Sequence, residues 1–195
     1  MTNPAIILDL DDTLGNIKER LQNIYRKKTG RTDIHYRDWK DFGSVHYDFS
    51  FDDLTQFFIE DNTLRLMRPH AGTIETTARL KSLGYDIHIV TARGWHPDAQ
   101  AITEGWLTEN NITFDQVHIV PFGQCKEELT RTIPNIAFFV DDRIDHCLAM
   151  HKSGRVNKQV LVYAQPWNED QFVEHEGKDD SFQRIEDIRE ILRFL

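Results

Sequence analysis

Three carboxylates follow a short apolar run near the start of the chain, and they are the residues best placed to do chemistry. The run from Ala5 to Leu8 is followed by Asp9, Asp11 and Asp12. Successive apolar residues are typical of a strand buried on both faces of a parallel sheet, and ligands bind at the carboxyl ends of such strands. Carboxylates this close repel each other unless a cation lies between them or one keeps a proton. The segment predicts a site for a hard cation such as Mg²⁺, with an Asp-rich turn as the alternative.

A second apolar run ends in groups that suit a phosphate. Residues 87–90 are followed by Thr91, Ala92 and Arg93. A hydroxyl, a guanidinium fork and nearby backbone amides are all donors to phosphate oxygens. The alternative is a turn in which the threonine caps a helix.

A third run repeats the pattern of the first. Residues 136–140 are apolar and lead into Asp141 and Asp142. Two strands ending in paired aspartates are hard to explain as turns. Between the second and third runs, Lys126 stands at the predicted start of a helix. It is a further candidate for this edge of the sheet, although a single lysine is more often a solvated surface residue.

The elements that must position these residues alternate between strands and helices, which predicts an α/β fold with a Rossmann-like parallel sheet. Strands are expected over 5–10, 86–91, 116–120, 136–140 and 159–163. Helices are expected over 72–83, 98–110, 125–132, 144–152 and 181–195.

Residues 15–70 break this alternation and predict a small helical cap inserted after the first strand. An amphipathic helix is expected from residue 16 to Thr29, ended by Gly30. A capping box at residues 50–53 predicts a second helix. The catalytic core is therefore expected over 1–14 and 71–195, with the cap between them.

Aromatic residues crowd the middle of the predicted cap. They form either the core of the cap or a pocket that stacks a flat ligand, since stacking contributes ~1–3 kcal/mol per base. The candidates for such a pocket are Tyr36, Trp39 and Phe42, from a group that also includes Tyr47, Phe49 and Phe51.

Composition limits the possible partners. The 195 residues carry a net charge of −9, which argues against non-specific nucleic-acid binding but permits a small phosphorylated substrate. No apolar run approaches the ~20 residues of a membrane helix, and no signal peptide is evident, so a cytoplasmic location is expected. Cys125 and Cys147 form no C-x-x-C pair, and the histidine spacing matches no zinc motif. Oligomeric state is left open.

Taken in order, these pieces resemble the haloacid-dehalogenase (HAD) superfamily of phosphohydrolases. Residues 9–14 are similar to its first motif, Thr91 to the second, Lys126 to the third and Asp141 with Asp142 to the fourth. The insertion resembles the helical C1 cap of that superfamily. Within it, the aromatic cap, residues 90–93 and residues 165–168 are most similar to the type C 5′(3′)-deoxyribonucleotidases.

The resemblance implies a role for each residue. Asp9 would be the nucleophile that forms an aspartyl-phosphate, and Asp11 the proton donor and acceptor. Mg²⁺ would be held by Asp9, by Asp141 and by Asp11 through its backbone carbonyl, with Asp142 orienting the shell around the ion. Substrate phosphate would be bound by Thr91, Ala92, Arg93 and Lys126.

The function expected from these roles is a Mg²⁺-dependent phosphatase for (deoxy)nucleoside monophosphates. Alternatives are a phosphatase for another small phosphate ester or for a nucleic-acid 3′ end, and a non-catalytic phosphate-binding module. The last would not need the proton-transferring carboxylate.

Overall fold

A six-stranded parallel sheet forms the centre of the molecule. The structure is a computed structural model that describes residues 2–33, 35–39, 48–121 and 123–195. The strands run in the order β5-β4-β1-β6-β7-β8. Their bounds are β1 Ala5–Leu8, β4 Asp86–Thr91, β5 Gln116–Ile119, β6 Ile136–Asp141, β7 Gln159–Tyr163 and β8 Phe182–Ile185. The predicted α/β class with a parallel sheet is confirmed.

The first strand is central because both of its faces are apolar. Ile6 and Leu8 pack into one buried cluster, while Ala5 and Ile7 pack into another on the opposite face. β1 pairs with β4 on one side and with β6 on the other, so all of its ladder positions are used. This placement buries the strand completely and brings its carboxyl end to the middle of the sheet edge.

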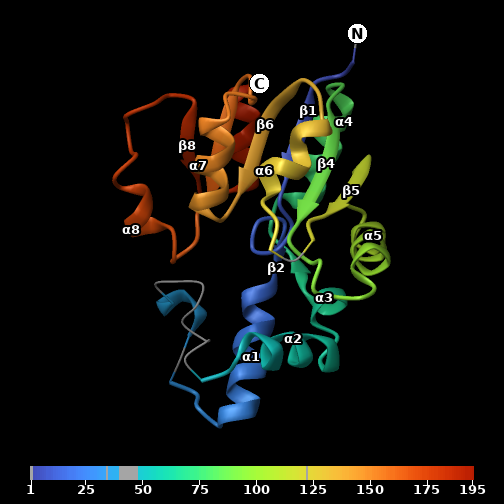
Figure 1. Ribbon diagram of the computed structural model, residues 1–195, viewed down its shortest axis with the longest axis vertical. Helices are drawn as coiled ribbons and strands as arrows, with labels where there is room; N and C mark the ends of the chain where they lie inside the picture. The colour runs from blue at the N-terminus through green and yellow to red at the C-terminus, as the bar shows by residue number, and fades with distance from the viewer. Residues whose placement is uncertain (1, 34, 40–47, 122) are drawn as a thin grey trace.

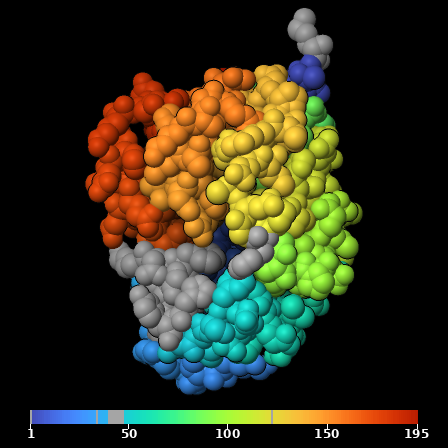
Figure 2. All heavy atoms as spheres, in the orientation of Figure 1, coloured from blue at the N-terminus to red at the C-terminus, as the bar shows by residue number. Residues whose placement is uncertain are grey.

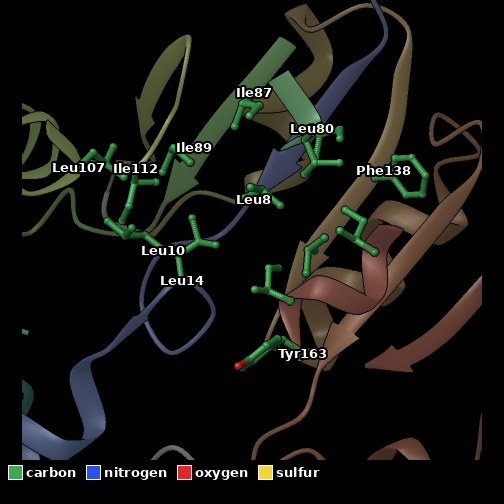
Figure 3. Close-up of a cluster of buried hydrophobic side chains, with 14 of the residues drawn as sticks. Leu8, Leu10, Leu14, Leu80, Ile87, Ile89, Leu107, Ile112, Phe138 and Tyr163 are labelled. Atoms are coloured by element: carbon green, nitrogen blue, oxygen red, sulfur yellow. The ribbon is translucent and has the colours of Figure 1, made fainter. Parts of the chain in front are cut away.

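Helices cover both faces of the sheet (Figure 1). The cluster around Ile6 takes side chains from α4, α5 and a C-terminal 3₁₀ helix, and that around Ile7 takes them from α7 and α8. Figure 3 shows the first cluster, with Leu80 of α4 and Leu107 of α5 near the strand residues Leu8 and Ile89. The bounds are α4 Thr73–Ser82, α5 Ala99–Glu109, α6 Lys126–Leu129, η3 Thr130–Thr132, α7 Ile144–Lys152, α8 Glu169–Phe172 and η4 Ile188–Phe194.

The insertion after β1 lies beyond the carboxyl ends of the strands (Figure 1). Its two connections to the core pair as a short antiparallel ribbon, with Gly15 opposite Pro69. The elements are β2 Gly15–Asn16, α1 Ile17–Thr29, η1 Tyr36–Asp38, α2 Phe51–Glu60, α3 Thr63–Leu66 and β3 Arg68–Pro69.

Both expected helices of the insertion are present. Asp12 accepts a hydrogen bond from the backbone N–H of Lys18 in the first turn of α1, and Gly30 ends that helix at a φ of 72°. Ser50 and Asp53 form the expected capping box of α2. Among the described residues, no helix is both long and apolar enough to cross a membrane.

The helix expected over 181–195 was wrong in its first part. Residues Phe182–Ile185 instead form β8, which pairs in parallel with β7 and covers its free edge. A capping box at Asp187 then starts η4. Apolar residues three apart suggested one continuous helix, but from Ile188 they follow the three-residue turn of a 3₁₀ helix.

Candidate active site

Asp9, Thr91 and Asp141 lie at the carboxyl ends of three adjacent strands, β1, β4 and β6. Asp9 follows β1 directly, and its backbone N–H donates to the carbonyl of Val140 at 2.9 Å. The chain builds the sheet outward from β1 on one side, through β4 and β5, and then on the other, from β6 onward. Ligands bind at this kind of switch point in open α/β sheets. Three residues expected from sequence are therefore brought together.

Lys126 links the ends of β1 and β6. Its ammonium donates to Asp9 Oδ1 and to Asp141 Oδ2, the latter at 2.7 Å, and the side chain is 3% exposed. An ammonium between two buried carboxylates offsets their mutual repulsion. The lysine thus lies beside the predicted nucleophile rather than on the protein surface.

Burial and charge shift the proton affinities of these groups in different directions. Burial raises the pKa of Asp9 to about 6, although Lys126 acts against it. Burial also opposes ionisation of Asp141, but Lys126 and His146 hold the pKa of that carboxyl below its usual range. Burial alone would lower the pKa of Lys126, whereas Asp141 and Asp9 raise it above the usual range. The site therefore favours a charged Lys126 with an ionised Asp141.

Three buried carboxylates form a donor set for a hard cation. One oxygen each from Asp9, Asp141 and Asp142 lies within 4.8 Å of the others. Oxygen donors of this kind match the preference of Mg²⁺, and gathered carboxylates need positive charge nearby. These residues fit the ion. The side chain of Asp11 is outside this set, which leaves its backbone carbonyl as the expected contribution.

The loop after β7 holds this donor set in place. Trp167 Nε1 donates to Asp142 Oδ2 at 2.9 Å, and Asn168 Nδ2 donates to the carbonyl of Asp142 at 2.7 Å. Gln165 Nε2 donates to the carbonyl of Asp12 at 2.6 Å. All of these side chains are buried. The loop therefore holds Asp142 by its side chain and its carbonyl, and Asp12 by its carbonyl.

Arg93 is placed differently from the sequence expectation. Its guanidinium, expected at the phosphate, binds both carboxylate oxygens of Asp11, at 2.8 and 2.6 Å, and is fully buried. The Thr91 hydroxyl also donates to Asp11, at 3.3 Å. Ala92, between them, is exposed and lines the cavity described next. Of these three residues, Ala92 faces the open space.

A cavity of about 330 Å³ lies between the insertion and the sheet edge. Figure 2 shows the hollow between cyan atoms of α2 and the yellow and orange atoms of the core. Its floor includes Asp9, Asp11 and Lys126, and its opposite wall is largely apolar. The apolar lining residues are Ile17, Leu21, Phe51, Leu54, Phe58, Trp95, Val120 and Pro121. The candidate catalytic groups therefore open into a space shared with the insertion.

Of the aromatic group singled out from sequence, Phe51 lines this cavity, whereas Tyr36 and Trp39 are not among its lining residues. Trp39 is buried with Leu21, Tyr25 and Leu54 in a cluster inside the insertion that lies behind the cavity wall formed by Leu21 and Leu54, and Tyr36 packs against that cluster. Phe42 lies outside the described residues. The proposed pocket role of Tyr36 and Trp39 is therefore replaced by a packing role, the other interpretation of the aromatic group.

Among the described residues, the aromatic side chains that line the cavity are Phe51, which belongs to that group, and Phe58 and Trp95, which do not. Phe58 and Trp95 have ring centroids 5.9 Å apart and join α2 to the loop after β4. Trp95 lies two residues after Arg93 in the sequence, and this closeness to the end of β4 could have predicted that it lines the site.

Two further polar residues at the cavity were missed from sequence. His146 Nδ1 lies 3.2 Å from Asp141 Oδ2, because α7 turns the ring back towards β6. Lys18 is buried on α1, with its ammonium 4.9 Å from the ring centre of Trp167. Burial lowers the pKa of Lys18 to about 8, although Asp12 and Asp142 act in the opposite direction. Both positions depend on tertiary contacts that spacing along the chain does not reveal.

Comparison with known proteins bears on the fold. No protein-family model matches the chain. It is 25% identical to a "Putative nucleotidase" of Oceanobacillus iheyensis over 198 residues, covering 95% of each protein. The structure is similar to that of a "Putative Phosphatase" from Clostridium difficile, with a TM-score of 0.66, 15% identity, and coverage of 98% of this chain and 99% of that one.

A HAD-superfamily hydrolase from Geobacter sulfurreducens has a TM-score of 0.60 and 17% identity, with each chain fully covered. Two further structures are similar: a "putative phosphoglycolate phosphatase" from Lactobacillus plantarum, with a TM-score of 0.60 and 13% identity, and a D,D-heptose 1,7-bisphosphate phosphatase from Burkholderia thailandensis, with a TM-score of 0.55 and 12% identity. The chain therefore has the fold of the HAD superfamily.

Proposed function

We propose that the protein is a Mg²⁺-dependent phosphomonoesterase that hydrolyses (deoxy)nucleoside monophosphates. The observation that carries the proposal is the meeting of Asp9, Lys126 and Asp141 at the switch point of the sheet. Asp11 lies on the floor of the same cavity. A nucleophile, a cation and a proton carrier are thus available at one place, which is what phosphoryl transfer through a covalent intermediate requires.

In the first half of the proposed reaction, a carboxylate oxygen of Asp9 attacks phosphorus. The ester P–O bond breaks, and the leaving oxygen takes a proton from Asp11. Asp9 then carries the phosphoryl group. Lys126 stabilises the negative charge that develops on the phosphoryl oxygens, because its ammonium is already beside Asp9.

In the second half, water attacks phosphorus and gives a proton to Asp11. The bond between phosphorus and Asp9 breaks, which releases inorganic phosphate and restores both carboxylates to their starting states. The same residue acts first as acid and then as base, so no other proton carrier is needed.

The proposal includes a metal held by Asp9, Asp141 and Asp142, whose oxygens are gathered at the sheet edge. When bound, Mg²⁺ screens the repulsion between the attacking carboxylate and the phosphate dianion. Trp167 and Asn168 orient Asp142 for this task through their hydrogen bonds.

Support for a nucleotide substrate comes from the cavity and from the relative. In this proposal residues 15–70 act as the cap, and Phe51, Phe58 and Trp95 offer rings against which a flat base can pack. The name of the Oceanobacillus iheyensis relative and the resemblance to type C 5′(3′)-deoxyribonucleotidases point the same way. A cap over the site opposes a polymer end as substrate.

The second candidate is another small phosphate ester. Structures named for phosphoglycolate and heptose bisphosphate phosphatases share the fold, so the fold alone does not select the substrate. The polar residues Thr55, Gln124 and Arg143 also line the cavity and suit a hydroxylated substrate.

A phosphate-release assay with and without Mg²⁺ tests the proposal, using nucleoside monophosphates, sugar phosphates and p-nitrophenyl phosphate. We expect Mg²⁺-dependent turnover that is fastest with a nucleotide. Preference for a sugar phosphate would support the second candidate, and absence of turnover on every ester would refute the enzyme. Asp9→Asn is expected to abolish turnover and Asp180→Asn, at an exposed carboxylate, to preserve it.

A further inference from the structure

We propose that Arg93 is a positioning residue that fixes the carboxylate of Asp11 for proton transfer, a role that rests on the proposed function. Arg93 Nε donates to Asp11 Oδ2 at 2.8 Å and Nη2 donates to Oδ1 at 2.6 Å. This is a two-point contact between a planar fork and a carboxylate, so it sets the direction of both oxygens as well as their distance.

Both terminal nitrogens of Arg93 have further protein contacts. Nη1 donates to Thr103 Oγ1 on α5 at 3.0 Å, and Nη2 contacts the sulfur of Met67 at 3.4 Å. The side chain is fully buried. A buried guanidinium whose three nitrogens all have protein acceptors is held in place by them and does not reach a ligand in the cavity. Arg93 therefore acts on a substrate through Asp11 and not by touching phosphate.

Asp11 and Arg93 differ in their exposure to the cavity, and this difference indicates which of them can reach a substrate. The Asp11 side chain is 24% exposed and lines the cavity, whereas Arg93 is enclosed behind it. Thr91 adds a third donor to Asp11, at 3.3 Å from Oδ2. The carboxylate is thus held from its protein side while its open side faces the substrate space.

The elements that hold Arg93 connect the proton carrier to the base of the insertion. Met67 directly precedes β3, where the chain returns from the insertion, and its carbonyl accepts a hydrogen bond from Trp106 Nε1 of α5 at 2.9 Å. Gly15 lies against the same methionine, so close that an added Cβ would be 2.8 Å from Met67 Cε. The position of Arg93 is therefore set by α5 and by both connections of the insertion.

A comparison of leaving groups tests the role. Alkyl phosphates release a strongly basic alkoxide that needs a proton, whereas p-nitrophenolate leaves without one. The kcat/KM value reports steps up to departure of the leaving group, so it isolates the acid role of Asp11 from its later role as base. The probes are p-nitrophenyl phosphate and the alkyl phosphate that the wild-type protein hydrolyses fastest, both with saturating Mg²⁺.

Arg93→Lys is expected to lower kcat/KM for the alkyl ester by ~10² because general acid catalysis contributes on that order. The loss of kcat/KM with p-nitrophenyl phosphate should be at least tenfold smaller, because its leaving group needs no proton from Asp11. The substitution replaces the two-point fork by a single ammonium and leaves the nucleophile Asp9 unchanged. Thr103→Val, which removes only the hydroxyl that holds Nη1, should shift the ratio of the two values in the same direction by a smaller factor. Thr76→Val is the matched control, since the buried hydroxyl of Thr76 has no hydrogen-bond partner among the described residues.

Each outcome decides the proposal. Equal losses on both esters in a folded Arg93→Lys variant would overturn the positioning role while leaving the proposed function intact. If Arg93→Lys does not fold by circular dichroism, the ratio for Thr103→Val decides, and an unchanged ratio overturns the role. A wild-type protein that hydrolyses neither ester would overturn the proposed function and this role with it.

Discussion

The ammonium of Lys126 lies between the carboxylates of Asp9 and Asp141, which belong to separate strands. The contact to Asp141 Oδ2 measures 2.7 Å, and all three side chains are buried. The residues are far apart in the chain, so the pairing of β1 with β6 is what brings them together. This lysine consequently contributes to the stability of the site as well as to its proposed chemistry.

Replacing Lys126 with methionine should expose that double role. Without the ammonium, two buried carboxylates face each other, and removing one partner of a buried ion pair costs about 3–5 kcal/mol. Urea denaturation in the presence of a chelator should show a loss of this size. Added Mg²⁺ should raise the free energy of unfolding of the variant more than that of the wild type, because a cation then replaces the missing charge. Lys152→Met, at an exposed lysine, is the control, and equal Mg²⁺ effects in variant and wild type would contradict the prediction.

Trp167→Phe should weaken Mg²⁺ binding. The variant keeps an aromatic ring but loses the N–H that donates to Asp142 Oδ2 at 2.9 Å. Loss of groups that orient metal ligands typically lowers affinity ~10–100-fold. Calorimetric titration of the protein with Mg²⁺ measures the change directly. Trp39→Phe, in the cluster inside the insertion, should bind Mg²⁺ like the wild type; a Trp167→Phe variant with unchanged affinity would show that the bond does not orient a ligand.

Phe58→Ala should distinguish a base-binding wall from simple packing. Phe58 lines the cavity and contacts Trp95, with ring centroids 5.9 Å apart. If a base packs on these rings, KM for a nucleotide should rise about tenfold, equivalent to ~1.4 kcal/mol, while KM for a small sugar phosphate changes less. Steady-state kinetics on both substrates measures the difference. Phe57→Ala, on the neighbouring position of α2, controls for loss of an aromatic ring, and parallel changes on both substrates would argue against base contact.

His70 should make stability depend on pH. Burial lowers the pKa of His70 from 6.5 to about 4, and its Nε2 is buried without a hydrogen-bond partner among the described residues. The unfolded chain therefore binds a proton more readily than the folded one between these values. The stabilisation is fully present above pH 6.5 and is lost as the pH falls towards 4, by up to ~3 kcal/mol at 1.4 kcal/mol per pKa unit.

His70→Phe removes the titrating ring and should flatten this part of the stability curve. The measurement is urea denaturation of both proteins at several values between pH 4 and 7, since the difference between them cancels other titrating groups. Curves that stay parallel throughout would refute the assignment to His70.

Much of the core was predictable because local signals agree with the tertiary structure there. A short apolar run such as residues 5–8 is typical of a fully buried strand, and polar residues at the carboxyl ends of parallel strands meet at one edge of the sheet. The expected helix starts and stops were equally local, as at Gly30 and at the capping box of Ser50. These features depend only on residues that are close in the sequence, so they can be predicted from it.

The rest depended on contacts between distant segments. A guanidinium next to Thr91 suits a phosphate and a carboxylate equally well, and only the position of Asp11 decides between them. Trp39 could line a pocket or fill a core, which depends on how the insertion folds. Residues 182–185 have a spacing that also fits a helix, and the unpaired edge of β7 made them a strand.

The ribbon formed by β2 and β3 separates the residues of the insertion from those of the central sheet. Gly15 and Pro69 lie directly opposite each other in this ribbon, and all six strands of the central sheet lie outside the stretch between them. In evolutionary terms, variation at the cavity-lining positions of that stretch can change the wall that faces a ligand, provided that Met67 keeps its contact to Arg93 and Lys18 its hydrogen bond to Asp12. Swapping those positions between related proteins is accordingly a practical route to altered selectivity.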